Sequence, residues 1–371
     1  MSDFIPVCAP LLGQREVELV TQAVREGWIS SAGPFVQSFA EKFAAYVGAP
    51  FAEPVANGTV GLHVVLHALG IGPGDEVIVP SQSFVATGAA VKYCGATPVF
   101  ADVEAKTWNI DPNDVAAKLT PRTRAVIPVH LFGVCADMAA IRRVLRDRPD
   151  VAVVEDAAEA FGSTQGNVRA GALGDAAVFS FYGNKTLTTG EGGMVTTRRG
   201  DLADRVRFLK NHGMSTTKRY FHPEIGFNYR MTSLQAAIGL AQLEAADDLT
   251  SRKRRLDARY RAALAALPGI RFQEVPPGDV AVPWMVVFTD EALEGEETRD
   301  EVMKRMRTRG IETRPMFYPI HRLPAFAGCP GGPLPVTDQI SFRGLALPSG
   351  AGLTDAEVDR SIEAYLAERP R

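Results

Sequence analysis

Residues 151–163, VAVVEDAAEAFGS, begin with a run of apolar residues and pass directly into acidic ones. Three similar apolar runs precede them: EVIVP from residue 76, PVFAD from residue 98 and RAVIPV from residue 124. Stretches with helical character lie between these runs, near 83–93, 111–119 and 137–146. Strands that alternate with helices predict βαβ units, and wholly apolar strands are typical of a parallel sheet covered on both faces. The sequence therefore predicts an α/β fold with a large, mostly parallel sheet.

The pattern changes after residue 175. AAVFSF from residue 176 and GGMVTT from residue 192 are two strand-like runs, and the polar loop YGNKTLTTGE separates them. A helix is expected near 200–211, and Thr232 with Gln235 forms a capping box that predicts the start of another helix. These elements complete the expected large domain.

A long charged helix, expected from Glu244 towards Leu264, leads into the C-terminal part of the chain. There the sequence predicts a strand over 284–289, a helix capped by Thr298 that Gly310 ends, and a last helix capped near Thr354. The basic run 252–255 predicts a solvated helix face rather than a recognition patch. We expect residues 1–245 to form an N-terminal arm and the large domain. Residues 246–371 would then form the bridging helix and a smaller α+β domain.

The composition of the chain excludes several classes of protein. Forty Lys and Arg stand against 43 Asp and Glu, and the net charge of −3 gives no basic field for nucleic acid or an anionic membrane. No apolar run approaches the length of a membrane span, and the first residues lack the basic segment of a secretory signal. The four cysteines show no metal-binding spacing and predict free thiols in a reducing cytoplasm.

Asn57-Gly58-Thr59 directly precedes a predicted helix whose apolar stripe includes Leu62 and Leu66. A small residue at a helix start exposes free N–H groups at the positive end of the helix dipole, which favours an anion. A plain N-cap explains the same residues, so both interpretations stand.

Asp156 and Lys185 are the two charged residues in unusual places. Asp156 follows a buried parallel strand, at the sheet edge where α/β folds bind ligands. It could bind a metal, act as a base, pair with a protonated ring nitrogen, or cap the next helix. Lys185 lies among glycines between two apolar strands, where a desolvated amine could form a Schiff base. Asn184 precedes it, so no phosphate-binding GxxxxGK[ST] loop is present, and GxGxxG is also absent.

The histidines give little indication of a metal, and no metal site is predicted. His63 and His67 share a helix but lack the zinc-protease pattern, so we expect them to be packed or hydrogen-bonded. His130 ends the strand RAVIPV and lies at the same expected edge as Asp156, where a site role stays open.

An anion-binding helix start, a strand-end Asp and a loop Lys, in that order, are the parts of a pyridoxal phosphate site. The phosphate requires the helix start, the pyridine nitrogen requires a carboxylate, and the aldehyde requires an amine. Phe84 and His130 come from strand-end regions that could cover the face of the ring.

Long segments of the chain resemble one family. These segments are PGDEVIVPS, YCGATPVFADV, PVHLFG, VVEDAAEAFGS, LGDAAVFSFYGNKTLTTGEGGMVTT and GFNYRMTSLQAAIGLAQLE. They are similar to the DegT/DnrJ/EryC1/StrS family of pyridoxal-phosphate-dependent sugar aminotransferases, and the similarity runs from about residue 10 to the C-terminus. The resemblance implies fold type I, with a seven-stranded, mostly parallel sheet in the large domain and a small α+β domain.

The resemblance also implies roles for individual residues. Lys185 matches the Schiff-base lysine that moves protons, and Asp156 matches the partner of the pyridine nitrogen. Gly58 and Thr59 match the phosphate-binding residues, with Ser180 as a further donor. Other matching positions are Phe84, which would stack on the ring, Asn228, which would reach the phosphate bound by the partner subunit, and Glu159, which replaces the His or Gln of many members.

The resemblance further implies a homodimer with shared active sites, L-glutamate as amino donor and a keto-sugar nucleotide as acceptor. Four residues fall in segments that would approach the sugar nucleotide: His130, Arg230, Tyr318 and His321. EDAAEA, GNKTLTTGEGG and IETRPMFYPIH look closest to the branch that converts GDP-4-keto-6-deoxymannose into GDP-perosamine. A GDP-3-keto, dTDP- or UDP-linked sugar or a keto-cyclitol remains an alternative acceptor. A lyase or a non-catalytic sensor is disfavoured, as is the branch that carries His in place of the lysine.

Overall fold

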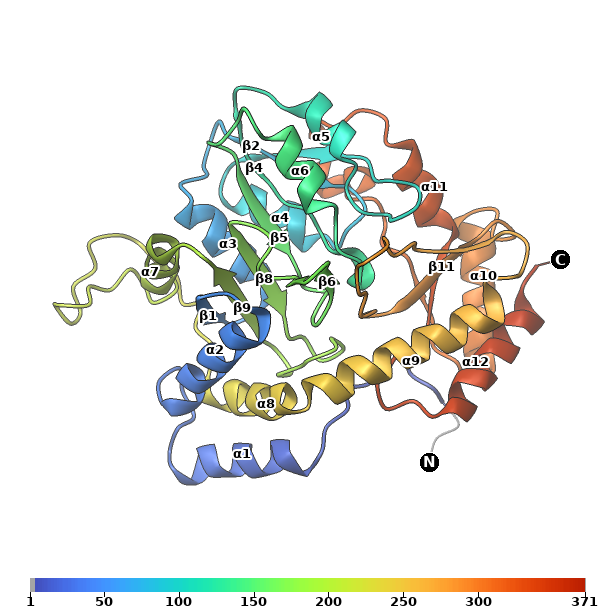
Figure 1. The fold of residues 1–371 in the computed structure, drawn as a ribbon, viewed down its shortest axis with the longest axis horizontal. Helices are drawn as coiled ribbons and strands as arrows, with labels where there is room; N and C mark the ends of the chain where they lie inside the picture. Colours follow the sequence, from blue (N-terminus) through green and yellow to red (C-terminus); the bar gives the residue numbers. More distant parts are fainter. Residues whose placement is uncertain (1–3, 371) are drawn as a thin grey trace.

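The computed structural model describes residues 4–370. Seven strands form one sheet in the order β1-β9-β8-β5-β4-β2-β3 (Figure 1). Their bounds are β1 (Phe51–Val55), β2 (Glu76–Pro80), β3 (Thr97–Ala101), β4 (Thr123–Val126), β5 (Ala152–Asp156), β8 (Ala176–Ser180) and β9 (Gly193–Thr197). Only β9 runs antiparallel to its neighbours within this sheet, which confirms the prediction of a mostly parallel sheet.

Helices cover both faces of this sheet (Figure 1). The helices of this part are α1 (Gln14–Arg25), α2 (Pro34–Val47), α3 (Gly58–Ala68), α4 (Ala86–Tyr93), α5 (Pro112–Lys118), α6 (Met138–Val144), α7 (Gly200–Leu209) and α8 (Ser233–Glu244), of which α1 packs on α8. Strand β2 illustrates why both faces are apolar. Val77 and Val79 pack in the cluster beneath α3, whereas Ile78 packs with Ile141 of α6 on the other side. Successive strand residues point to opposite faces, so a strand covered twice must be apolar at every position.

A second sheet, in the C-terminal part, has four antiparallel strands in the order β10-β11-β13-β12. The elements of this part are α9 (Ala246–Leu264), β10 (Ile270–Phe272), β11 (Val286–Asp290), α10 (Glu296–Thr308), β12 (Arg314–Pro315), α11 (Pro335–Arg343), β13 (Gly344–Leu347) and α12 (Asp355–Glu368). Helix α9 follows α8 directly and leads from the large sheet to this second sheet (Figure 1). A small hairpin of β6 (Thr164–Gln165) and β7 (Val168–Arg169) completes the strands of the described chain.

The division at residue 245 stays a prediction, and contacts of the N-terminal segment run across it. Ile5, from the N-terminal segment, bridges to Ile311 and packs in the apolar cluster of the four-stranded sheet. The backbone N–H of Val7 donates to Glu312 Oε2 at 3.0 Å. Ile5 and Val7 therefore pack against the C-terminal part, although the prediction grouped them with the large domain.

Two local predictions are wrong. Helix α10 begins at Glu296 with Gly295 as its N-cap, not at Thr298. Glu296 and Glu297 lie in its first turn, where carboxylates interact favourably with the helix dipole, and this start includes Thr298 in the helix. The basic run 252–255 is not wholly solvated, because Lys253 within it is 1% exposed. Lys253 shares the buried side of α9 with Leu249, Leu256, Tyr260 and Leu264.

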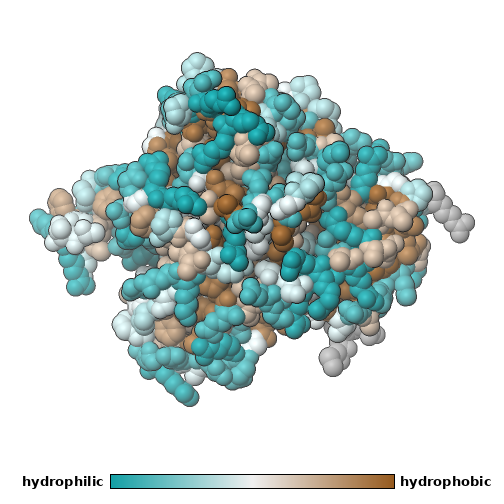
Figure 2. All heavy atoms as spheres, in the orientation of Figure 1, coloured by the Kyte–Doolittle hydropathy of each residue, from teal (hydrophilic) through white to brown (hydrophobic). Residues whose placement is uncertain are grey.

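The surface in Figure 2 is largely hydrophilic, with apolar residues scattered between polar ones. None of the helices within residues 4–370 combines the length and apolar composition that a membrane span requires. All four cysteines are free, as predicted. The loop after α7 extends away from the rest of the molecule at the left of Figure 1.

Candidate active site

Lys185 lies in the turn that follows β8. Its Nζ is 3.7 Å from Glu159 Oε1 and lies 3.3 Å from the centroid of the Trp284 ring. Burial lowers the pKa of the Lys185 amine, and the nearby carboxylates partly oppose that shift. A buried amine with a lowered pKa is suited to nucleophilic attack and proton transfer.

Asp156 ends β5 and is buried. Thr87 Oγ1 donates to Asp156 Oδ2 at 2.7 Å, and the Ala158 N–H donates to Oδ1 at 3.2 Å. Burial raises the pKa of the Asp156 carboxyl, whereas these hydrogen bonds lower it. No helix begins directly after Asp156 within the described chain, so Asp156 is not a helix cap. A buried carboxylate of this kind is stabilised by a cationic partner such as a protonated ring nitrogen.

Glu159 lies close to both of these residues. Its Oε2 accepts from the Phe132 N–H at 2.9 Å, while Oε1 faces Lys185. Burial raises the pKa of the Glu159 carboxyl to about 7, and the Lys185 charge opposes this rise. The structure thus brings together three of the predicted residues, Lys185, Asp156 and Glu159, in one buried cluster.

The start of α3 meets the end of β8 nearby. Asn57 caps the helix, because its side chain accepts from the Val60 N–H at 3.0 Å. The N–H groups of Gly58 and Thr59 precede this bond and belong to the first turn, where backbone donors lack helical partners. A Cβ on Gly58 would lie 3.0 Å from Ser180 Cβ, a tight contact that glycine avoids.

Gly58 and Thr59 thus lie beside Ser180, and this arrangement would suit an anion. A helix start and a hydroxyl suit a phosphate, Asp156 suits a protonated pyridine nitrogen, and Lys185 suits an aldehyde. The residues present fit pyridoxal phosphate. Within residues 4–370 no group of three or more His, Cys, Asp or Glu has an arrangement that could hold a metal ion.

Aromatic side chains line the same region. Phe84 is 55% exposed, and its ring centroid lies 5.8 Å from that of Phe317. Phe317 stacks on Phe132 at 5.6 Å, and Phe132 stacks on Trp284 at 6.3 Å. The exposed ring of Phe84 remains available for stacking on a planar ligand.

Sequence reasoning missed Thr87, Trp284 and Phe317. Thr87 had a usable signal, because it lies in the first turn of α4, the helix that follows β2, at the same sheet edge as Asp156. Phe317 directly precedes Tyr318, which was singled out. Trp284 gave no local signal, since its role depends on a contact with a residue almost one hundred positions away.

His130 is placed differently from the expectation that it covers the ring or contacts substrate. Its side chain is fully buried, its Nδ1 accepts from the Ala136 N–H at 3.1 Å, and its Nε2 lies 2.9 Å from Glu155 Oε2. Because Nδ1 is an acceptor, the proton lies on Nε2, which donates to Glu155. Both ring nitrogens are thus used within the protein, and neither is left for a substrate.

Tyr318 and His321 also have partners within the chain. The Tyr318 hydroxyl donates to Glu296 and lies near Arg299, on a different side of the chain from the stacked ring of Phe317. His321 Nδ1 lies 2.7 Å from Ser81 Oγ, directly after β2. His321 therefore lies near the sheet edge that carries Asp156, whereas Tyr318 does not join the aromatic cluster.

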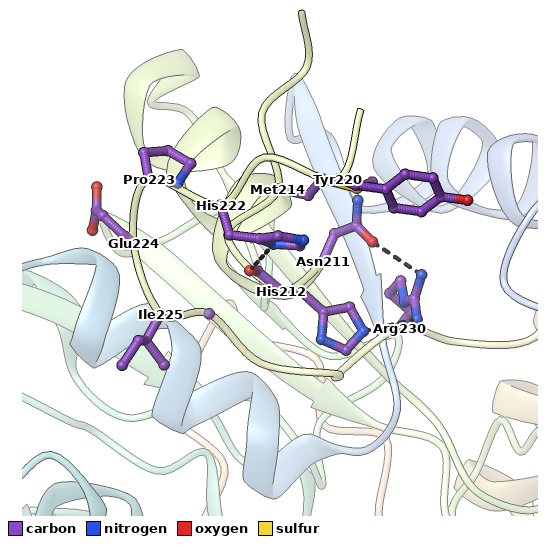
Figure 3. Close-up of a pocket in the computed structure, with 10 residues that line it drawn as sticks. Asn211, His212, Met214, Tyr220, His222, Pro223, Glu224, Ile225 and Arg230 are labelled. Carbon is purple, nitrogen blue, oxygen red and sulfur yellow. Dashed lines mark hydrogen bonds between the residues drawn. The ribbon is translucent and has the colours of Figure 1, made fainter. Parts of the chain in front are cut away.

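Asn228 and Arg230 lie in the segment that follows the extended loop. The Arg230 guanidinium donates to Asn228 Oδ1 at 2.9 Å and to Asn211 Oδ1 at 3.0 Å. Figure 3 shows that Arg230 and Asn211 line a hollow of about 740 Å³ together with His212, His222 and Tyr220. The residues that line this hollow do not include Lys185, Asp156 or Glu159. The backbone of this segment lies beside the start of α3, because the Ala56 N–H donates to the Tyr229 carbonyl at 2.9 Å.

Comparisons with known proteins agree with this site. The family model described as the DegT/DnrJ/EryC1/StrS aminotransferase family matches residues 10–365. The chain is 46% identical to GDP-perosamine synthase of Caulobacter vibrioides over 98% of both chains. It is 42% identical to GDP-perosamine synthase of Escherichia coli O157:H7 over 96% of both.

A solved structure is also similar. The PLP form of a putative sugar aminotransferase from Streptococcus pneumoniae superposes with a TM-score of 0.93 at 26% identity, covering 99% of this chain and 98% of that one. The sequence match, the fold and the buried lysine–carboxylate cluster lead to the same conclusion. The chain belongs to the DegT/DnrJ/EryC1/StrS aminotransferase family and is a pyridoxal-phosphate-dependent transaminase.

Proposed function

We propose that this transaminase moves the amino group of L-glutamate to GDP-4-keto-6-deoxymannose and forms GDP-perosamine and 2-oxoglutarate. The observation that carries the proposal is the 46% identity to a GDP-perosamine synthase over 98% of both chains. The buried cluster of Lys185, Glu159 and Asp156 supplies the residue types that the reaction requires.

The chain's own residues have distinct tasks in this reaction. Bound pyridoxal phosphate supplies the electron sink that stabilises negative charge at the reacting carbon. The Lys185 amine removes the proton from the α-carbon of glutamate, and in the second half of the reaction it delivers a proton to C4 of the sugar. Asp156 holds the ring-nitrogen proton, and the Gly58–Thr59 helix start with Ser180 binds the phosphate. Glu159 lies beside Lys185 and keeps the amine oriented.

The proposed enzyme is a homodimer in which Asn228 and Arg230 complete the partner's site. The hollow that Arg230 lines does not include Lys185, Asp156 or Glu159 among its lining residues, which supports this assignment. Mixing the inactive variants Lys185→Ala and Asn228→Ala tests it. Mixed dimers carry one intact site, so mixing with subunit exchange should restore about a quarter of wild-type activity. No recovery in verified mixed dimers would contradict shared sites.

The substrate is tested with a panel of keto-sugar nucleotides and L-glutamate. The panel contains GDP-4-keto-6-deoxymannose, a GDP-3-keto sugar, dTDP- and UDP-linked 4-keto sugars and a keto-cyclitol. We expect the highest kcat/KM for the first, with the amino sugar identified by mass spectrometry and 2-oxoglutarate formed in equal amount. A higher kcat/KM for a dTDP- or UDP-linked sugar would refute the assignment.

A cytoplasmic location is proposed from the four free cysteines, which suit a reducing compartment.

A further inference from the structure

Lys253 is a buried cation that the mechanism above does not use. It occupies the buried stripe of α9, and its Nζ donates to the backbone carbonyls of Trp284, at 2.6 Å, and of Ser349. Burying an amine carries a large desolvation penalty, and hydrogen bonds offset only part of it. Burial accordingly lowers the pKa of the Lys253 amine. A residue of this kind at a position that suits leucine calls for a structural explanation.

Trp284 is held through both its backbone carbonyl and its side chain. Lys253 holds its carbonyl, and its indole Nε1 donates to the Asn184 carbonyl at 2.8 Å. The indole ring stacks against Phe132 at 6.3 Å and Phe317 at 6.2 Å. The four-stranded sheet thus places an oriented indole directly against the residue that precedes the reactive lysine.

The face of this indole lies against the Lys185 amine, with Nζ 3.3 Å from the ring centroid. The ring face carries negative charge density, so it attracts an ammonium ion and interacts far less with a neutral amine. The effect is greatest where water is excluded, and the Lys185 side chain is only 12% exposed.

We propose that Trp284, anchored by Lys253, is a positioning residue that stabilises Lys185 as an ammonium ion each time its free amine has taken up a proton. The indole provides a defined resting place in which the proton removed from one substrate is retained for the next transfer. The proposal rests on the assignment of Lys185 as the cofactor-binding lysine. It does not depend on which sugar is the substrate.

Three other groups act on the same amine. Glu159 lies 3.7 Å away, and Asp156 and Cys8 add further attraction for the charged form. Burial opposes all of these and is the largest influence. The contribution of Trp284 must therefore be measured with these groups intact, which requires variants at position 284 itself.

The test uses the full-length enzyme loaded with pyridoxamine 5′-phosphate, in which the Lys185 amine is free. Brief acylation at a series of pH values, followed by peptide mass spectrometry, gives the fraction of neutral Lys185 at each pH. The midpoint is the pH at which half of Lys185 is neutral. Trp284→Leu should lower this midpoint by about one pH unit, the magnitude of a desolvated cation–π contact. Lys253→Met should lower it less, because the indole is retained but loses one anchor.

A second series addresses the possibility that Trp284→Leu does not fold. Site-specific incorporation of tryptophan with one to four ring fluorines at position 284 keeps the shape of the side chain and removes charge density from its face. The midpoint should fall progressively with fluorination. Phe272 belongs to the same sheet, and the centroid of its ring lies 4.9 Å from the guanidinium carbon of Arg261. Phe272→Leu removes this ring and should leave the midpoint of the Lys185 titration unchanged.

A midpoint that stays within about 0.2 pH units of wild type across the fluorinated series would overturn the proposal. An equal shift in Phe272→Leu would also overturn it, because it would show a general effect of ring loss. Borohydride reduction of the pyridoxal phosphate form and peptide mapping separately establish whether Lys185 carries the cofactor. Failure of the proposed sugar specificity would leave the labelling result unaffected.

Discussion

The Thr87 hydroxyl is expected to keep Asp156 charged, and Thr87→Val tests this. Thr87 Oγ1 donates to Asp156 Oδ2 at 2.7 Å, and both side chains are buried. Valine has nearly the shape of threonine but no hydroxyl, so the substitution removes this bond with little change in packing. Asp156 would keep its longer bond from the Ala158 N–H at 3.2 Å.

The magnitude follows from the charge of the acceptor. A hydrogen bond to a charged group contributes about 1.5–3 kcal/mol, and about 1.4 kcal/mol corresponds to one pKa unit. Burial already raises the pKa of the Asp156 carboxyl, and loss of the bond would raise this pKa by about one to two further units. A neutral carboxyl cannot hold the protonated ring nitrogen. Cofactor affinity should therefore fall roughly 10- to 100-fold.

The assay is equilibrium dialysis of the full-length protein with pyridoxal phosphate near neutral pH. Thr87→Ser keeps a hydroxyl and should bind the cofactor within about threefold of wild type. Ser83→Ala is the matched control, because Ser83 Oγ lies 2.9 Å from Thr87 Oγ1 and makes no bond to Asp156 within the described chain. A folded Thr87→Val protein with wild-type affinity, or a Thr87→Ser protein as weak as Thr87→Val, would refute the reasoning.

Three further predictions concern the same site. Lys185→Ala should abolish turnover and the absorbance of the lysine-bound cofactor, and a fully active variant would exclude Lys185 as the reactive amine. Gly58→Ala places a Cβ 3.0 Å from Ser180 Cβ and should weaken pyridoxal phosphate binding about tenfold in dialysis; unchanged affinity would exclude Gly58 from the phosphate-binding residues. Burial raises the pKa of Glu159 from 4.5 to about 7, so its contribution to stability is present below 4.5 and is lost as the pH rises through about 7. Glu159→Gln should therefore lose less thermal stability than wild type between about pH 5 and pH 8, and equal losses in calorimetry would contradict the raised pKa.

The strands of the large sheet could be predicted from sequence because each is buried on both faces. The apolar run of β5 is preceded by charged residues, and the strand ends at the charged Asp156. The start of α10 could not be predicted in the same way, since Thr298 offers a local capping pattern and Glu296 offers a favourable charge for the dipole. Two local signals compete there, and packing decides between them.

The candidate site likewise contains residues whose position the sequence indicates and residues whose orientation depends on tertiary contacts. Asp156 ends a strand, Gly58 begins a helix and Lys185 lies in the turn after a strand, so the sequence alone indicates where the backbone places each of them. His130 was assigned to the correct edge, but the direction of its ring depends on Glu155 and Ala136, which bind both nitrogens. Contacts of this kind follow from tertiary packing and leave no periodic pattern in the sequence.

Lys253 shows that the composition of a segment and the position of a residue around its helix can give different predictions of burial. Here the position around the helix gives the correct prediction. By composition, the run 252–255 predicts a solvated face. By phase, Lys253 lies four residues after Leu249 and three before Leu256, and therefore on the buried stripe of α9. A lysine in such a stripe must find acceptors inside the fold, and the acceptors it finds are backbone carbonyls of the segments that lead into and out of the four-stranded sheet. One of these carbonyls belongs to Trp284, whose ring contacts Lys185. Two contacts thus connect Lys253 with the reactive amine: its hydrogen bond to the Trp284 carbonyl, and the contact of the Trp284 ring with Lys185.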